Sequence, residues 1–335
     1  MSTPSNSLFG RLLTSPPPPA AIEISSRRVS VVALSSNGSS RTVTGQSSEP
    51  LADGVVTPAL NGPNVHDPAA LAAAVQAAAD RISPRPKRVA LLLPDTVAKV
   101  SLVRFEKVPP KAQDLEQLIR WQVRKAAPFR IEDAQVSWVE GAVAADGARD
   151  YLVLVARRDI VQSYERGCDA AGIHPGIVDI VSTNQVNAVL ATDPAASSGD
   201  WMLVHTAPDY STIAVVRNGR AIFFRSRPAE GLPQDMGDLV HQTAMYYEDR
   251  LGGTAFSRVV LAGTSSFDVA LADRGRKQIE ERLGVKTEIL DVRKGVTLRD
   301  RIAAGPDVLD ALAPAAGILL RDLAPVAARG RDRVA

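Results

Sequence analysis

The sequence predicts an α/β protein of two similar halves, with a small α+β subdomain inserted in the first. Strand-forming runs that end in an Asn-Gly turn occur near residue 20 and again near residue 200. Strand and helix patterns alternate after each run, and a block of about 80 residues with a different pattern interrupts the first half. At 335 residues, the chain is long enough for two domains that each bury a core.

The composition is that of an ordinary globular protein. Hydrophobic residues make up 45% and charged residues 23%, and the net charge of +2 gives no reason to expect nucleic acid. The single cysteine, Cys168, cannot form an intramolecular disulfide and is expected to be a buried, inert thiol. No run reaches the roughly 18 to 20 apolar residues that cross a bilayer, and no secretory signal is recognisable. We therefore expect a cytoplasmic location.

The first half begins after a tail. Residues 1–19 are rich in Ser, Thr and Pro and end in four prolines, which predicts disorder followed by a polyproline spacer. Residues 20–34 read as two strands around a polar turn, and Asn37-Gly38 predicts a hairpin turn into a third strand. "PAALAAAVQAAADRI", which begins at Pro68, predicts a helix, and "KRVALLLP" after it predicts a buried strand.

The inserted block has its own pattern. "SLVRFEKVP" alternates as a strand, and Asp114 is expected to cap the helix "DLEQLIRWQVRKAAPF", with Gln117 completing a capping box. Trp121 is expected to widen the apolar face of that helix, which Pro128 ends. The remaining elements of the block are expected near 134–140, 150–156 and 159–171.

The second half repeats the opening. "WMLVHTAPDYSTIAVVRNGRAIFFRS" is strand, polar turn, strand, Asn218-Gly219 turn and strand, with Glu23 matching His205 at an offset of 182 residues. Such a repeat suggests two similar halves that face each other. Further elements are expected at 234–250, 258–263, 273–283, "KTEIL" and 307–321. The predicted organisation is a tail (1–19), a first subdomain (20–93 and 173–198), an insert (94–172), a second half (199–325) and a tail (326–335).

The sequence carries none of the common enzyme motifs. It has no P-loop, dinucleotide-binding, zinc-protease or nucleophile-elbow pattern, and no paired cysteines. The four histidines are scattered along the chain, so no metal site is predicted. Aromatic residues make up only 4% of the chain, and basic patches interleaved with them are missing.

Several stretches resemble one family. The most specific are "WQVRKAAPFRIEDAQVSW" (121–138) and "YLVLVARRDIVQSYERGCDAAGIHPGIVDI" (151–180), and "MYYEDR" (245–250), "VVLAGTSS" (259–266) and "PAAGILLRDL" (314–323) follow in the family's order. From roughly residue 20 to 325, the chain is similar to the type IV pilus assembly protein PilM family of the actin-like ATPase superfamily. The resemblance implies an α/β, actin-like (ribonuclease H-like) duplicated core, with the small subdomain inserted in its first half.

The resemblance also implies a nucleotide site made of three glycine-containing turns, and each turn departs from the family pattern. Where the first phosphate turn has Asp two residues before Gly, this chain has Glu23 and Ser25. The second phosphate turn has His205 and Ala207, and the adenosine turn has Gly263-Thr264 in place of Gly-Gly. By position, the degenerate site comprises Ser25, Ser26, Arg27, Ala207, Pro208, Asp209, Gly263, Thr264 and Ser265.

These departures weaken phosphate and metal binding. A glycine lets the backbone approach phosphate closely, whereas a Cβ narrows the turn and Pro208 removes an N–H donor. His205 replaces the carboxylate that would hold a Mg²⁺-bound water. We expect weak or absent binding of ATP and Mg²⁺, no catalytic residue and no useful hydrolysis. Ser26 and Arg27 are the positions where an anion would still bind.

The function implied by the resemblance is that of a scaffold. It would lie at the cytoplasmic face of the inner membrane, in a type IV pilus or related secretion platform. There it would bind the short cytoplasmic tail of a PilN-like membrane protein, which would also provide its membrane association. By position, Phe105, Ile119 and Trp121 are expected to line the groove for this tail, with plain core residues as the alternative. An active ATPase of the pilus or type II secretion machinery, and a self-associating, division-type filament protein at the membrane, are the other functions considered.

Overall fold

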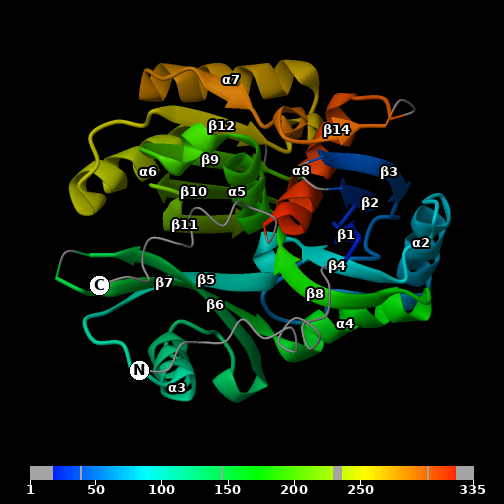
Figure 1. Ribbon diagram of the computed structural model, residues 1–335, viewed down its shortest axis with the longest axis horizontal. Helices are drawn as coiled ribbons and strands as arrows, with labels where there is room; N and C mark the ends of the chain where they lie inside the picture. Colours follow the sequence, from blue (N-terminus) through cyan, green and yellow to red (C-terminus); the bar gives the residue numbers. More distant parts are fainter. Residues whose placement is uncertain (1–17, 38–39, 145, 229–235, 300–301, 322–335) are drawn as a thin grey trace.

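The computed structural model describes residues 18–37, 40–144, 146–228, 236–299 and 302–321. Most of the two predicted tails, and the glycine of the predicted Asn37-Gly38 turn, lie outside these residues. Two large sheets are stacked with helices between and around them, and a small sheet lies beside them (Figure 1). Within the described part of the chain, no helix is long and apolar enough to cross a bilayer.

Five strands of the first large sheet have the same order as the five described strands of the second, and a further strand is added at one edge of the first. The first contains β1 (Ala20–Ile24), β2 (Arg28–Asn37), β3 (Ser40–Pro50), β4 (Arg88–Leu93), β8 (His174–Ile180) and β14 (Thr297–Leu298), in the order β14-β3-β2-β1-β4-β8. The second contains β9 (Asp200–Thr206), β10 (Tyr210–Arg217), β11 (Arg220–Pro228), β12 (Arg258–Ala262) and β13 (Thr287–Ile289), in the order β11-β10-β9-β12-β13. In each sheet the first strand pairs antiparallel with the second and parallel with the fourth. The predicted duplication is therefore confirmed.

The repeat extends to single hydrogen bonds in the turns. Ser25 N donates to Arg28 O at 2.9 Å in the first half, and Ala207 N donates to Tyr210 O at 2.9 Å in the second. These pairs are both 182 residues apart in the sequence. The predicted Asn218-Gly219 turn joins β10 to β11, and both of its residues have positive φ, as a two-residue hairpin turn requires.

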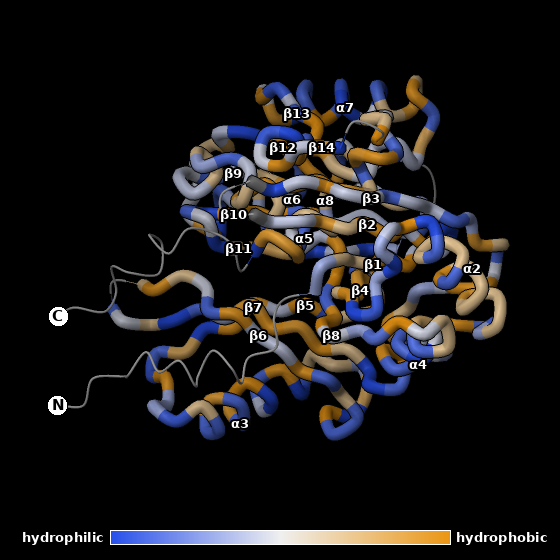
Figure 2. The backbone as a smooth tube through the Cα atoms, turned by 45° about the vertical axis from the view of Figure 1, so that its right-hand side comes forward, coloured by the Kyte–Doolittle hydropathy of each residue, from blue (hydrophilic) through white to orange (hydrophobic). Residues whose placement is uncertain are grey.

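The helices form three layers around the two sheets. Helices α2 (Pro68–Asp80) and α4 (Arg158–Ala170) cover the outer face of the first sheet, and α6 (Met236–Leu251) and α7 (Val269–Leu283) cover that of the second (Figures 1 and 2). Helices α5 (Val181–Thr192) and α8 (Pro306–Leu320) pack between the sheets. A Cβ on Gly317 of α8 would lie 1.7 Å from Asn184 O of α5, so this glycine sets how closely the two helices approach.

The insert is a separate three-stranded sheet. It contains β5 (Ala98–Phe105), β6 (Ala134–Val143) and β7 (Arg149–Arg157) in the order β5-β7-β6, and the short 3-10 helix η1 (Asp95–Val97) leads into it. Helix α3 (Ala112–Val123) packs on one face, where Ile119 is fully buried. The following helix, α4, instead contributes its buried residues to the core of the first half, including Cys168. Burial raises the pKa of the Cys168 thiol to about 12.

Two predictions for α3 are wrong, and helix α7 begins earlier than predicted. Lys111 precedes the helix in extended conformation and no side chain caps it, so Asp114 lies in the first turn rather than at the cap. Trp121 is 68% exposed, because it is two residues from Ile119 and therefore about 200° around the helix from the buried face. Helix α7 begins four residues before its predicted start, since Asp268 caps it through a bond from Ala270 N.

Candidate functional site

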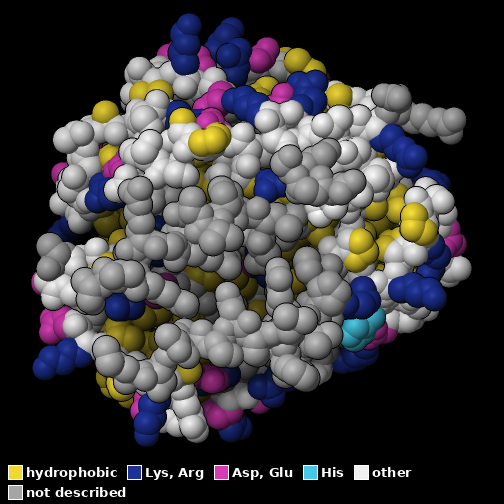
Figure 3. Space-filling model, in the orientation of Figure 1, with side chains coloured by type: hydrophobic (Ala, Val, Ile, Leu, Met, Phe, Trp, Pro, Cys, Tyr) yellow, Lys and Arg dark blue, Asp and Glu magenta, His cyan; other side chains and the backbone are white. Residues whose placement is uncertain are grey.

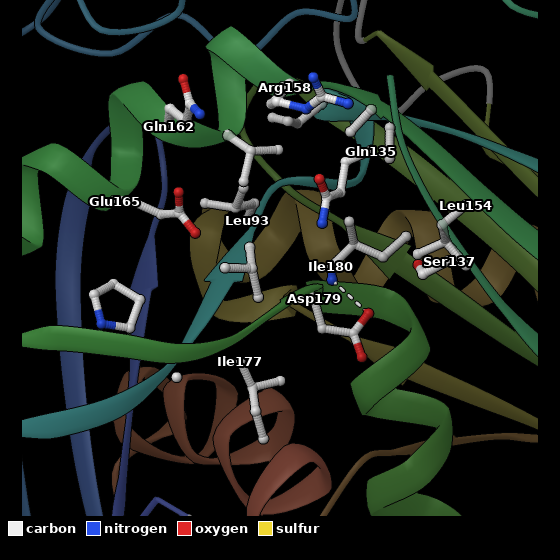
Figure 4. Close-up of a pocket in the computed structure, with 17 residues that line it drawn as sticks. Leu93, Gln135, Ser137, Leu154, Arg158, Gln162, Glu165, Ile177, Asp179 and Ile180 are labelled. Carbon is white, nitrogen blue, oxygen red and sulfur yellow. Dashed lines mark hydrogen bonds between the residues drawn. The ribbon is translucent and has the colours of Figure 1, made fainter. Parts of the chain in front are cut away.

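A groove of about 400 Å³ lies between the first half and the insert. One wall is the face of the inserted sheet opposite α3, because β6 and β7 contribute alternate residues to it. These residues are Gln135, Ser137, Leu154 and Ala156. Leu93 and Val97 form the floor. Figure 4 shows the side chains of α4 on one side, those of β6 and β7 on the other, and Leu93 between them.

The opposite wall combines a helix face with a strand edge. Helix α4 contributes Arg158, Val161, Gln162 and Glu165, which share one side of the helix at i, i+3, i+4 and i+7 spacing. Strand β8 contributes every residue from 175 to 180, so its edge rather than one of its faces borders the groove. Since β8 is the last strand of its sheet, this edge carries backbone donors and acceptors that no strand of that sheet pairs. The groove therefore suits an extended peptide.

One charge in the groove is left without a partner. Arg158 donates to Ala134 O at 3.2 Å, which holds the start of α4 to the insert. Burial raises the pKa of Asp179, and hydrogen bonds to its carboxylate, the first from Ile180 N, oppose this shift. Arg321 also donates to Asp179 at 3.1 Å. Within the described residues, Glu165 has no ion pair or side-chain hydrogen bond, so it is available to a cationic group of a bound peptide.

A buried carboxylate connects the floor of the groove to the second half. Asp95 of η1 is wholly buried. In the sequence it lies between Leu93 and Val97, which form the floor of the groove. It accepts hydrogen bonds from Ser182 N of α5 at 2.9 Å, from Ser182 Oγ, and from Thr212 Oγ1 of β10 at 2.6 Å. We call Asp95, Ser182, Thr212 and His205 the Asp95 latch. It joins η1, which leads into the insert, to α5 of the first half and to β9 and β10 of the second half.

His205 completes the latch without forming a hydrolytic triad. Its Nδ1 lies 2.9 Å from Ser182 Oγ. Because the only proton of that hydroxyl goes to Asp95, His205 Nδ1 must donate to the serine. The order is therefore Asp, Ser, His, whereas a Ser-His-Asp hydrolase has the histidine in the middle. All of these side chains are buried, which indicates a structural link rather than an exposed nucleophile.

In the two turns at the phosphate positions, backbone amides are hydrogen-bonded to other atoms of the same turn. In the first, Ser25 Oγ accepts from Arg27 N at 3.3 Å and from Arg28 N at 3.1 Å, as a serine turn does. In the second, Ala207 N donates to Tyr210 O, and Pro208 has no N–H. These backbone donors are therefore bonded within the turns.

The turn at the adenosine position is filled by a carboxylate. Asp310 of α8 accepts from Gly263 N at 3.0 Å and from Ser265 N at 2.8 Å. Gly263 has a φ of 76°, and a Cβ there would lie 2.0 Å from Thr206 O, so the glycine is required for the close approach of β9. Thr264 begins the 3-10 turn that follows.

Carboxylates gather where the turns converge. Burial raises the pKa of Glu23, an effect that Arg28 and His205 oppose and that Asp310 and Asp95 reinforce. Burial also raises the pKa of Asp209, while Ser26 and Arg27 lower it, so the predicted residues of the two phosphate turns do lie together. Among the described residues, no three His, Cys, Asp or Glu side chains are grouped as metal ligands.

The residues predicted to bind the partner lie on the other side of the inserted sheet. Phe105 and Ile119 are in the core between that sheet and α3, and Trp121 is exposed on α3. None of the three lines the groove. Their role in partner binding stays a prediction. The sequence reasoning also missed the latch and Asp310, although the position of Asp95 directly after a buried strand was a usable signal.

Comparisons with known proteins agree with this architecture. A family profile described as "Type IV pilus assembly protein PilM" matches residues 21–235. A solved PilM-PilN type IV pilus biogenesis complex is similar with a TM-score of 0.73 and 16% identity, over 91% of this chain and 98% of that chain. The cytoplasmic domain of EpsL from the Vibrio cholerae type II secretion system is similar with a TM-score of 0.48 and 12% identity, over 91% of this chain and 94% of that chain. A Bacteroides thetaiotaomicron protein with an actin-like ATPase fold has a TM-score of 0.48 and 10% identity, over 83% of this chain and 91% of that chain.

No curated protein sequence matches the chain. The family match covers well over half of its residues, and the similarity to the PilM-PilN complex extends along nearly the whole of both chains. The duplicated α/β core with its inserted sheet is thus an actin-like fold.

Proposed function

The chain belongs to the type IV pilus assembly protein PilM family, and from this premise we propose that it is a pilus assembly scaffold that works without nucleotide. In this proposal it holds the short cytoplasmic tail of a PilN-like membrane protein in the groove between α4, β8 and the inserted sheet. It would thereby be recruited to the cytoplasmic face of the inner membrane.

The observation that carries the proposal is the groove itself. Among the described residues, no strand pairs with the outer edge of β8, so an extended tail can add to it as a strand does, while apolar side chains of the tail contact Leu154 and Ala156. Glu165 would attract a Lys, an Arg or a free amino group of the tail. The ligand is therefore expected to be an extended, apolar segment with a cation at one end.

The state of the three turns supports a nucleotide-independent scaffold. Five of their amide donors, those of Arg27, Arg28, Ala207, Gly263 and Ser265, are bonded to Ser25, Tyr210 or Asp310, and the carboxylates of Glu23 and Asp209 lie at the two phosphate turns. In this proposal a bound adenosine would have to displace Asp310, and its anionic triphosphate would have to approach the carboxylates of Glu23 and Asp209. The Asp95 latch links η1 and α5 to the second half through side chains of this chain alone, with no contribution from a ligand.

The test is titration of the full chain with a labelled peptide that has the sequence of the PilN-like tail. Ala156→Phe fills the groove with an apolar side chain and should weaken binding at least tenfold. Glu165→Lys should weaken binding of a tail with a cation about fivefold, the effect of losing a partly exposed ion pair. Val139→Phe is the matched control, because Val139 is 59% exposed on the same sheet but does not line the groove.

The outcomes separate the proposed groove from the earlier prediction. Loss of binding in Ala156→Phe, with Val139→Phe and Trp121→Ala unchanged, supports the groove. Unchanged binding in Ala156→Phe with loss in Trp121→Ala would instead assign the tail to the α3 side of the sheet. Circular dichroism of each variant excludes unfolding as the cause.

A further inference from the structure

The outer face of α3 carries an exposed tryptophan among unpaired cations. We propose that this face binds anionic lipid headgroups directly. The face, which we call the α3 patch, consists of Gln117, Trp121, Arg124 and Lys125, which lie at i, i+4, i+7 and i+8 and so share one side of the helix and its C-terminal extension. The groove proposed for the tail makes no use of these residues.

Exposure and charge distinguish this patch from an ordinary solvated helix face. Trp121 is 68% exposed, whereas Trp201 is fully buried. The side chains of Arg124 and Lys125 are exposed, and within the described residues they form no ion pair or hydrogen bond. Residues 120–130 contain four cations and no acidic residue; Arg120 pairs with Glu116 and Arg130 with Glu132, which leaves Arg124 and Lys125 as the unpaired cations of this range within the described residues. This local excess is not a consequence of the whole chain, whose net charge is only +2.

These features match the chemistry of a bilayer surface. Tryptophan favours the interface between headgroups and acyl chains, and each Lys or Arg near an anionic membrane strengthens binding by about fivefold. None of the four patch residues lines the groove, and all four are exposed, which suits contact with a bilayer surface. One further argument rests on the proposed function, since a short tail of a membrane protein holds its binder close to the bilayer.

The test uses the full chain and vesicles, without any tail peptide. We expect the chain to co-sediment with vesicles that contain one part phosphatidylglycerol to two parts phosphatidylcholine, but not with phosphatidylcholine alone. Tryptophan emission should shift to the blue on binding, and Trp121→Ala should remove the shift and weaken binding about tenfold. Arg124→Ala with Lys125→Ala should weaken binding about twenty-five-fold, from about fivefold per cation.

A matched control has the same change in charge elsewhere. Lys and Arg side chains also project over α7, at the opposite end of the molecule from α3 (Figures 1 and 3). Arg274 and Lys277 are exposed there, so Arg274→Ala with Lys277→Ala should leave vesicle binding unchanged. Equal loss in this control would show a nonspecific charge effect and overturn the proposal.

Other results would also overturn it. Absence of binding to the anionic vesicles would refute the proposal while leaving the groove untouched, because tail binding is measured separately. Loss of tail binding in Trp121→Ala, without vesicle binding by the parent chain, would assign the patch to a protein partner. Self-association that Trp121→Ala abolishes, again without vesicle binding, would assign it to a second copy of the chain.

Discussion

The Asp95 latch is expected to give a measurable coupling energy between η1, which leads into the insert, and the second half. Thr212→Val removes one hydroxyl and keeps the shape of the side chain, while Asp95→Ala removes the acceptor. Both side chains are wholly buried, and Thr212 Oγ1 donates to Asp95 at 2.6 Å. No water can replace the lost bond without opening the interior.

The magnitude follows from the number of bonds. A hydrogen bond to a charged acceptor contributes about 1.5 to 3 kcal/mol, so Thr212→Val should lower the free energy of unfolding by about 2 kcal/mol. Asp95→Ala removes this bond and the two from Ser182, and leaves buried donors without an acceptor, so about 4 to 5 kcal/mol is expected. Once Asp95 is absent, Thr212→Val should cost little. The coupling energy of the pair is therefore about 2 kcal/mol.

The assay is urea denaturation of the parent chain, both single variants and the double variant, followed by tryptophan emission. Thr206→Val is the matched control, because the hydroxyl of Thr206 makes only a long bond of 3.4 Å to Ala262 O. Its effect should be below about 1 kcal/mol and should add to that of Asp95→Ala within about 0.5 kcal/mol. A coupling below about 0.5 kcal/mol between Asp95 and Thr212 would refute the latch.

Two further predictions concern packing and buried charge. Gly317→Ala should destabilise the protein by about 3 kcal/mol in thermal or urea denaturation, since its Cβ would overlap Asn184 O, whereas Gly275→Ala, with open space around it in α7, should stabilise by about 0.5 to 1 kcal/mol. Equal effects would contradict the close packing of α5 on α8. Burial raises the pKa of Glu23 above its ordinary 4.5. Above pH 4.5 the folded state therefore keeps a proton that the unfolded state has lost. The free energy of unfolding should fall as the pH rises through the pKa that Glu23 has in the folded state. Glu23→Gln should lack this loss, so its stability relative to the parent chain should increase as the pH rises above about 4.5, and parallel pH profiles would contradict the shift.

The repeat was legible in the sequence because local chemistry specifies it. Asn218-Gly219 tolerates positive φ at both residues, and apolar alternation places both faces of each central strand against helices. The first two turns were matched to each other by their offset, and the third turn was placed by the family resemblance. What the residues Ser25 and Asp310 do there could not be foreseen, since one bonds its own turn and the other arrives from a helix 47 residues beyond Gly263.

The errors have a common physical origin in tertiary contacts. Trp121 reads as apolar, yet Ile119 and Val123 already fill the face of α3 that packs on the sheet. The groove lies on the opposite face of that sheet, because α4 and β8 of the first half lie against it. Periodicity identifies the two faces of a strand but does not say which neighbour covers each. The Asp95 latch likewise brings together residues 117 positions apart.

The central claim is that the chain binds a PilN-like tail without help from nucleotide. Isothermal titration of the tail peptide into the full chain, with and without MgATP, tests it most directly. We predict the same affinity in both titrations, no heat of binding for MgATP alone, and loss of tail binding in Ala156→Phe. Micromolar MgATP binding that Arg27→Ala abolishes, or a tail affinity that depends on MgATP, would contradict the claim.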